Sequence, residues 1–250
     1  MLKLTAAISP RPDWTISEWL VHYSERHAPL TAAVRNFTRH GVRYLQNYAI
    51  HTPDVPDFPE RDAARAGVTE LWFESVDAIR AAYSEPDYFT YLRTDELRFC
   101  TFDNLIAGLA AEEELFAAWR PEGNDRAYLT EPRFKIFAYR HRIGSLDRPT
   151  FQRQWKEERA PALMSSAPFA QYVRRYVQSR TLDDDIGLPG GVAHDMIDEF
   201  SFTTLADAVA FWSAHREDET QAAADARHAD RAKLSIIFAR QHEVFGPLPA

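Results

Sequence analysis

The sequence contains an internal repeat that indicates two copies of one domain, and this repeat constrains the fold more than any other feature. His27-Ala28-Pro29 aligns with Arg159-Ala160-Pro161, and in both copies a tyrosine follows seventeen residues after the first member of the triplet. These tyrosines lie in Arg43-Tyr44-Leu45-Gln46 and Arg175-Tyr176-Val177-Gln178. A period of roughly 130 residues is far longer than the ~20–50 residues of a solenoid unit, so we expect two fused small domains.

Both halves predict the same order of elements. In the first half we expect strands at 2–8, 42–50, 68–74 and 115–119, helices from Ile16 and over 76–83, and a broken helical stretch around 86–105. In the second half we expect strands at 134–140, 172–180, 198–202 and 243–245 and helices after Asp147 and over 205–212. Thr15 with Glu18, Ser75, Asp147 and Thr204 are the predicted capping residues.

This order is β-α-β-β-α-β, the ferredoxin-like arrangement of a four-stranded antiparallel sheet with helices on one face. The bare face of each sheet must be covered, and a second copy can cover it. We therefore expect residues 1–120 and 133–250 to form two domains, joined by a linker at 121–132, that pack sheet to sheet as an internal pseudo-dimer. Whether the fused chain assembles into a further homodimer stays open.

Composition excludes several classes of function. The net charge of −8 and the lack of a basic stripe argue against nucleic acid and anionic membranes as partners. The one cysteine, Cys100, cannot form an internal disulfide and is expected to be a packed core thiol. No signal-peptide layout and no run of ~20 apolar residues is present, so a soluble cytoplasmic protein is expected.

Motifs for metal, phosphate and nucleotide binding are missing from the sequence. There is no His-Glu-x-x-His, no phosphate loop, no Gly-x-Gly-x-x-Gly and no Gly-x-Ser-x-Gly elbow. Aromatic residues make up 13% of the chain and can line a pocket for a flat organic ligand or fill two small cores. We therefore expect no cofactor and no metal.

Four stretches of the first half carry a family resemblance: Tyr23-Ser24-Glu25-Arg26-His27-Ala28-Pro29, Tyr44-Leu45-Gln46-Asn47, Gly67-Val68-Thr69-Glu70-Leu71-Trp72-Phe73 and Asp95-Glu96-Leu97-Arg98-Phe99. On these residues the segment 2–120 resembles the EthD family of the dimeric α+β barrel superfamily. The second half is similar to a more distant copy, through Trp155, Ala160-Pro161, Tyr176, Gln178, Glu199 and Phe202. It departs at Arg159, where the family pattern has histidine, which speaks against a second equivalent active site.

The resemblance implies an α+β fold in which two fused ferredoxin-like domains pack sheet to sheet as an intramolecular dimeric α+β barrel. It also implies a place in the degradation of organic compounds or in secondary metabolism, without a cofactor. Related barrels include lactone isomerases, polyketide cyclases, dehydratases, decarboxylases and cofactor-free monooxygenases, while other branches bind haem. The fold alone does not choose among these activities.

His27 is the leading catalytic candidate, because imidazole gains and loses a proton near neutral pH. It continues the apolar stripe of Trp19 and Tyr23, so its side chain should face the sheet. The alternative is a helix-end histidine that stabilises a break before Pro29. His22 lies about 100° from Tyr23 around the helix and is expected to be solvated.

Other candidates lie on the predicted strands. Tyr44 and Gln46 share one strand face and could orient a carbonyl or an oxyanion, although Tyr44 could equally be core. Glu70 lies in an apolar strand, where it could be a second acid/base or could pair with Arg43. Catalytic roles are therefore assigned to His27, Tyr44 and Glu70, and substrate-binding roles to Tyr23, Gln46, Trp72, Arg159, Tyr176 and Gln178.

In the second half, Arg159 could bind a carboxylate or phenolate, or could pair with Glu199. His194 is expected at the surface. For a haem, His27, His194 or His228 could be proposed as the axial ligand, but nothing singles one out.

Three functions follow. The first is a cofactor-independent lyase or isomerase that dehydrates, decarboxylates or shifts a proton on a small hydrophobic, cyclic or aromatic carbonyl compound. In it His27 moves the proton, Tyr44 and Gln46 orient the oxygen, and Glu70 assists. The second is a non-catalytic carrier of a hydrophobic metabolite, whose cavity would be closed, purely apolar and without His27 and Glu70. The third is a haem or oxygen-using enzyme.

Overall fold

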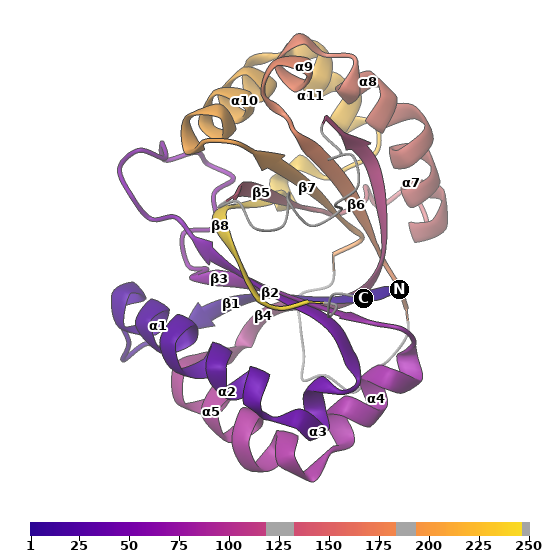
Figure 1. Ribbon diagram of the computed structural model, residues 1–250. Coiled ribbons are helices and arrows are strands. Elements are labelled where there is room, and N and C mark those ends of the chain that lie inside the picture. The colour runs from indigo at the N-terminus through magenta and orange to yellow at the C-terminus, as the bar shows by residue number, and fades with distance from the viewer. Residues whose placement is uncertain (119–132, 184–193, 247–250) are drawn as a thin grey trace.

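The computed structural model describes residues 1–118, 133–183 and 194–246, and within them the strands form one closed barrel (Figure 1). Going round the barrel the order is β1-β3-β2-β8-β5-β7-β6-β4, and every neighbouring pair is antiparallel. The strands are β1 (Leu2–Pro10), β2 (Gly41–Ala49), β3 (Gly67–Phe73), β4 (Cys100–Ala117), β5 (Arg133–Arg140), β6 (Arg175–Thr181), β7 (Met196–Phe202) and β8 (Ser235–Phe245).

The expected face-to-face packing of two ferredoxin-like sheets is therefore wrong. The last strand of each half is long enough to leave its own sheet and pair with the other half. Strand β4 pairs with β1 and then with β6, while β8 pairs with β5 and then with β2. The two sheets are joined at both edges instead of stacked, and closure leaves no strand edge exposed to further pairing.

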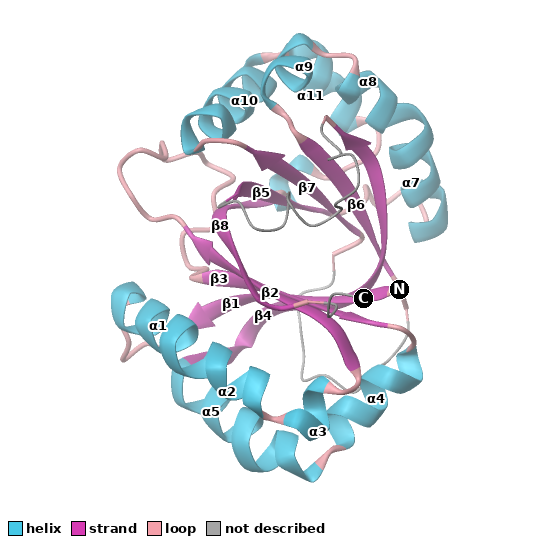
Figure 2. Ribbon diagram, in the orientation of Figure 1, coloured by secondary structure: helices cyan, strands magenta, loops and turns pink. Residues whose placement is uncertain are grey.

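Helices cover the barrel on two outer sides, one for each half (Figure 2). The first half contributes α1 (Ile16–His22), η1 (Tyr23–His27), α2 (Ala28–Ala33), α3 (Arg35–Thr38), α4 (Val76–Ser84), η2 (Tyr88–Arg93) and α5 (Thr94–Phe99). The second contributes α7 (Arg148–Gln154), η3 (Trp155–Arg159), α8 (Ala160–Met164), α9 (Ala167–Tyr172), α10 (Leu205–Glu217), α11 (Glu219–Ala226) and η4 (Arg231–Lys233). Among the described residues, none of these helices has the length and apolar character needed to cross a bilayer.

The capping residues start the helices where the sequence places them. Thr15 and Glu18 form the predicted reciprocal box, and Ser75, Asp147 and Thr204 each accept a hydrogen bond from a backbone N–H of the first turn. These bonds satisfy donors that would otherwise be left open at a helix start. The helix positions are thus fixed by local chemistry.

Some expected elements differ in the structure, and others lie outside the described residues. The break at Pro29 is not there, because the chain passes through the π turn η1 and continues as α2 with Pro29 in its first turn. Strand β4 starts at Cys100 and not at 115, so the expected helical stretch of 86–105 ends at Phe99 and its last residues are strand. The predicted linker at 121–132 and Trp119 lie outside the described residues.

The barrel interior and its outer layers have different chemistry. Apolar clusters fill the layers between sheet and helices in both halves. The interior combines a smaller apolar cluster with a group of fully buried charges, formed by Lys3, Glu70, Lys135 and Glu199. Such charges are tolerated inside a protein only when they are paired, and these are.

Candidate functional site

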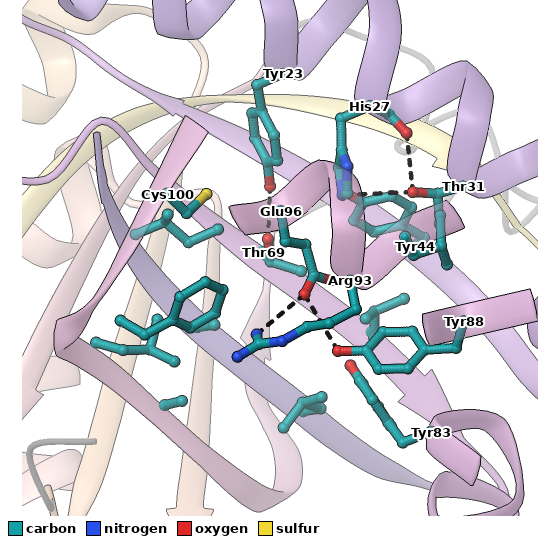
Figure 3. Close-up of a pocket in the computed structure, with 18 of the residues that line it drawn as sticks. Tyr23, His27, Thr31, Tyr44, Thr69, Tyr83, Tyr88, Arg93, Glu96 and Cys100 are labelled. Atoms are coloured by element: carbon teal, nitrogen blue, oxygen red, sulfur yellow. Dashed lines mark hydrogen bonds and ion pairs between the residues drawn. The ribbon is translucent and has the colours of Figure 1, made fainter. Parts of the chain in front are cut away.

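A cavity of about 90 Å³ lies in the first half, between the outer face of the sheet and the covering helices (Figure 3). Its sheet side is apolar, with Leu4, Ala6, Ile8, Leu71, Leu105 and Ala107 among the lining residues. The helices supply aromatic and polar side chains, which include Tyr23, His27, Tyr83, Tyr88, Arg93 and Glu96. The cavity therefore has one apolar wall and one wall with polar and titratable side chains.

The π turn η1 presents Tyr23 and His27 to this cavity. The N–H of Ala28 donates to the carbonyl of Tyr23, an i→i+5 bond that widens the turn. The two rings consequently stack, with centroids 5.8 Å apart and an interplanar angle of 16°. Pro29 has no N–H to donate, and it sits in the first turn of α2, where that loss is tolerated.

Asp95 orients the imidazole of His27. Its Oδ2 lies 3.0 Å from His27 Nδ1, which leaves Nε2 on the side of Thr31, a residue that lines the cavity. Burial alone would raise the pKa of Asp95, but His27 and His22 together hold that pKa below its usual value. An ionised carboxylate on Nδ1 fixes the tautomer and stabilises a protonated ring, the arrangement used by catalytic His-Asp pairs.

A second polar group occupies another part of the cavity wall (Figure 3). Tyr88 donates its hydroxyl to Glu96 Oε2 at 3.1 Å, and Arg93 Nη1 lies 3.4 Å from the same oxygen. Burial raises the pKa of Glu96 against the opposing charges of His27 and Arg93. The guanidinium of Arg93 also lies 4.0 Å from the centroid of Phe102. This wall can therefore offer a carboxyl group, a phenol and a cation to a substrate.

The structure brings three of the predicted residues together at the cavity: Tyr23, His27 and Tyr44. Gln46 lies directly behind them, donating Nε2 to the Tyr44 hydroxyl and to the Tyr23 carbonyl, both at 2.9 Å. Tyr23 shares a 2.6 Å hydrogen bond with Thr69, which also lines the cavity. Gln46 thus holds the aromatic wall in place and is not itself among the lining residues.

Cys100 also lines the cavity, as a buried thiol. Burial raises its pKa well above the usual value. Since the thiolate and not the thiol is the nucleophile, this residue packs against the cavity and is poorly suited to attack a substrate.

Glu70 and Trp72 point to the other face of the sheet, into the barrel. Glu70 accepts hydrogen bonds from Lys3 at 3.1 Å, Lys135 at 2.7 Å and Asn47 at 2.8 Å. The expected pairing of Glu70 with Arg43 is wrong, because Arg43 pairs with Glu243. Period-two alternation puts Glu70 and the cavity-lining Thr69 on opposite faces, so the sheet separates Glu70 from His27.

Arg159, Tyr176 and Gln178 lie together in the second half, in a fully buried polar cluster. Arg159 Nε pairs with Asp225, so the expected pairing with Glu199, which faces the barrel interior, is wrong. Tyr176 donates to Asp198 at 2.7 Å, and Gln178 donates to the Tyr176 hydroxyl at 2.7 Å. The cluster also contains Arg140, Trp155 and His215.

Two histidines lie elsewhere than expected. His22 is buried rather than solvated, with its Nε2 3.0 Å from Asp95 Oδ1. His194 is buried rather than exposed, with its ring edge-on to Tyr139 at 5.2 Å.

The residue-by-residue reasoning missed Asp95, Glu96, Arg93, Tyr83 and Tyr88. All five lie on helices after β3 and meet His27 only through the fold. Asp95 and Glu96 lie in one of the stretches that carry the family resemblance. Two adjacent carboxylates on a helix just before an apolar strand were therefore the sequence signal that could have identified them as candidate site residues. Local sequence patterns do not show that these side chains point toward His27.

A haem does not fit this cavity. The space of about 90 Å³ lies below even the ~300–1,000 Å³ of ordinary ligand pockets. His228 lies beside Glu158 and Trp155 in the second half.

Residues 11–103 match the family model of the EthD domain, which confirms the resemblance of the first half. The matched segment supplies most of the cavity lining, including His27, Arg93, Glu96 and Cys100. A search of curated protein sequences found no match.

Solved structures with a similar fold share little sequence with the chain. An anthrone oxidase-like protein is 12% identical with a TM-score of 0.65, covering 100% of this chain and 95% of its own. Chlorite dismutase from Candidatus Nitrospira defluvii, in complex with imidazole, is 11% identical with a TM-score of 0.53 (97% and 91% covered). A protein from Fusobacterium nucleatum assigned as a monooxygenase is 7% identical with a TM-score of 0.53 (98% and 92%). These likenesses establish the barrel fold for this chain and do not by themselves establish its activity.

Proposed function

We propose that this protein is an acid–base enzyme that moves a proton on a small, mostly apolar, cyclic or aromatic carbonyl compound. The observation that carries the proposal is the contact of His27 Nδ1 with Asp95 at 3.0 Å in a cavity with an apolar wall. Reactions of this class include proton shift, dehydration and decarboxylation, and all begin with or depend on a positioned base.

Each residue has a place in the proton transfer. His27 Nε2 takes the proton from the carbon or hydroxyl next to the carbonyl, and Asp95 stabilises the resulting imidazolium. Tyr88 and Arg93, which Glu96 holds beside one another, bind the substrate oxygen as negative charge develops on it. Glu70 takes no part in this scheme, since the sheet separates it from the cavity.

The polar wall also bears on the carrier alternative. A cavity built for carriage would be closed and purely apolar, whereas this one is lined by His27, Arg93 and Glu96. Placing charged and titratable groups at an apolar site costs free energy, which is the usual mark of a site that does chemistry.

A cofactor-free oxidation by O₂ is the second candidate, supported by the fold similarity to the anthrone oxidase-like protein. It would begin with the same step, in which His27 removes a proton from an activated carbon. The resulting carbanion would then be oxidised by O₂ rather than reprotonated. The two candidates differ only after the proton has been removed.

The test follows hydrogen exchange into candidate carbon acids. Phenols and cyclic aryl ketones of one to three rings are incubated with the protein in D₂O, and loss of the carbon-bound proton is followed by NMR, with and without O₂. The exchange rate should fall by ~10²–10⁴-fold in His27→Ala. His40→Ala is the matched control. His40 Nε2 lies 3.0 Å from Glu85 Oε1, and His40 is not one of the residues that line the cavity.

Exchange at the wild-type rate in His27→Ala would remove that residue from the mechanism. Product that forms only in the presence of O₂ would favour the oxidation, and product that forms equally without O₂ would favour the lyase or isomerase.

A further inference from the structure

Asp95 contacts two imidazoles and not one. Its Oδ1 lies 3.0 Å from His22 Nε2, and its Oδ2 lies 3.0 Å from His27 Nδ1. All three side chains are buried, with exposures of 11% for His22 and 9% for the other two. One carboxylate thus holds the oriented ring of the cavity on one oxygen and a second ring on the other.

The π turn makes this possible. His22 and His27 are five residues apart, so an α-helix would place them about 140° apart around its axis. The i→i+5 bond from Ala28 N–H to Tyr23 carbonyl widens the intervening turn and brings both rings toward α5. Phe99 then packs against both, with centroids 4.7 Å from His22 and 5.1 Å from His27.

We propose that His22 is a positioning residue for His27, acting through the shared Asp95. By holding Oδ1, His22 fixes the carboxylate plane so that Oδ2 meets His27 Nδ1, and His27 Nε2 is directed to the cavity. The inference rests on the proposed function for its consequence in catalysis, but the coupling of the two rings is a property of the protein alone.

The shared carboxylate also links the charges of the two rings. One carboxylate carries one negative charge, so two imidazolium rings on it would leave a net positive charge in a buried place. A proton on His22 therefore opposes a proton on His27. The other ionisable groups near the pair are Tyr23 on η1, Arg93 on η2, Glu96 on α5 and Cys100 on β4, which line the same cavity as His27.

The direction of the effect follows from this competition. Two variants of His22 separate its role as a hydrogen-bond donor from its ability to carry a charge. His22→Gln retains an N–H donor for Asp95 Oδ1 but cannot become charged. With the competing charge removed, the titration of His27 should move to higher pH. His22→Leu removes both the donor and the charge.

The test is an NMR titration of the imidazole nitrogens in the full chain, with signals assigned through His22→Gln and His27→Gln. We expect two coupled titrations in the wild type, a shift of the His27 midpoint to higher pH in His22→Gln, and no shift in the surface control His40→Gln. In activity, the acid limb of kcat/KM should move the same way in His22→Gln with the plateau kcat within about 3-fold of wild type, whereas His22→Leu should lose ~10-fold or more in kcat.

An unchanged His27 titration in His22→Gln would overturn the inference while leaving the proposed function standing. If instead the titrations are coupled but His27→Ala keeps full activity, the proposed function fails and the coupling remains. Should His22→Leu fail to fold, the His22→Gln titration decides the matter alone.

Discussion

His27 and Arg159 occupy equivalent positions, each at the end of a π turn followed by Ala-Pro, yet their surroundings differ. His27 lines a cavity and contacts Asp95, whose other partner is a second histidine. Arg159 is packed into a cluster of two arginines and two aspartates, with Arg140, Asp198 and Asp225. In the first half this position holds a titratable imidazole beside a cavity. In the second half it holds a permanently charged guanidinium that is packed in a buried ion-pair cluster.

The barrel interior, by contrast, is nearly symmetric. Lys3 and Lys135 enter from β1 and β5, and Glu70 and Glu199 enter from β3 and β7. Glu70 accepts from both lysines, and Lys3 also contacts Glu112 at 2.9 Å. The residues that join the halves have stayed alike, while those that face the helices have diverged. Closure of the barrel constrains both halves equally, whereas the layer between sheet and helices can change in each half separately.

The largest expected difference is in stability. Asp225→Asn should lower the free energy of unfolding by about 3–5 kcal/mol, because it leaves Arg140 and Arg159 buried with too little negative charge. Asp95→Asn should cost only about 1–2 kcal/mol, because its histidine partners can become neutral. Urea unfolding of both variants at pH 7 measures the contrast, and equal losses would contradict a purely structural role for the second cluster.

A smaller effect is expected from the pH dependence of the interior. Burial raises the pKa of Glu199 to about 7, so its proton is held more tightly in the folded state than in the unfolded chain. This stabilising contribution is complete below the ordinary pKa of a glutamate and is lost as the pH rises through about 7. Between pH 5 and 8 the wild type should therefore lose about 1–3 kcal/mol relative to Glu199→Gln.

The control for this measurement is Glu113→Gln. Glu113 forms a partly exposed ion pair with Lys156, outside the interior cluster. Its pH profile of unfolding should parallel that of the wild type. A Glu199→Gln profile that also parallels the wild type would mean that the interior carboxylate is ionised throughout this range.

The smallest effect is expected at the polar wall of the cavity. Tyr88→Phe removes one hydrogen bond to Glu96, worth about 1 kcal/mol, and should raise KM about 5-fold with little change in kcat. Tyr91→Phe, an exposed tyrosine of the same π segment, should change neither constant. A fall in kcat with unchanged KM in Tyr88→Phe would place this hydroxyl in proton transfer rather than in binding.

Local chemistry made much of the fold predictable. Thr15, Ser75, Asp147 and Thr204 fix helix starts within their own first turn, and alternation along β2 and β3 sets their faces. Whole-barrel closure was not accessible in this way. The pairing of β4 with β6 and of β8 with β2 depends on strand edges contributed by the other half, which no local pattern encodes.

The site was predictable in the same partial sense. His27, Tyr23 and Tyr44 follow from periodicity on one helix and one strand. His22 did not, because it lies about 100° from Tyr23 on the helical wheel and is buried only by residues that the wheel does not contain, among them Asp95 and Phe99. Asp95 and Glu96 come from a helix about seventy residues further along the chain, so only the fold brings them to His27.

The pairing of Tyr44 with Phe245 places a constraint on how the chain is made. During synthesis the free edge of β2 emerges roughly two hundred residues before the strand that will cover it. Contacts so far apart in sequence form slowly, and an uncovered edge is open to unwanted pairing while it waits. The nascent first half is therefore expected to depend on chaperones until β8 leaves the ribosome, even though its own helices and cavity are already encoded.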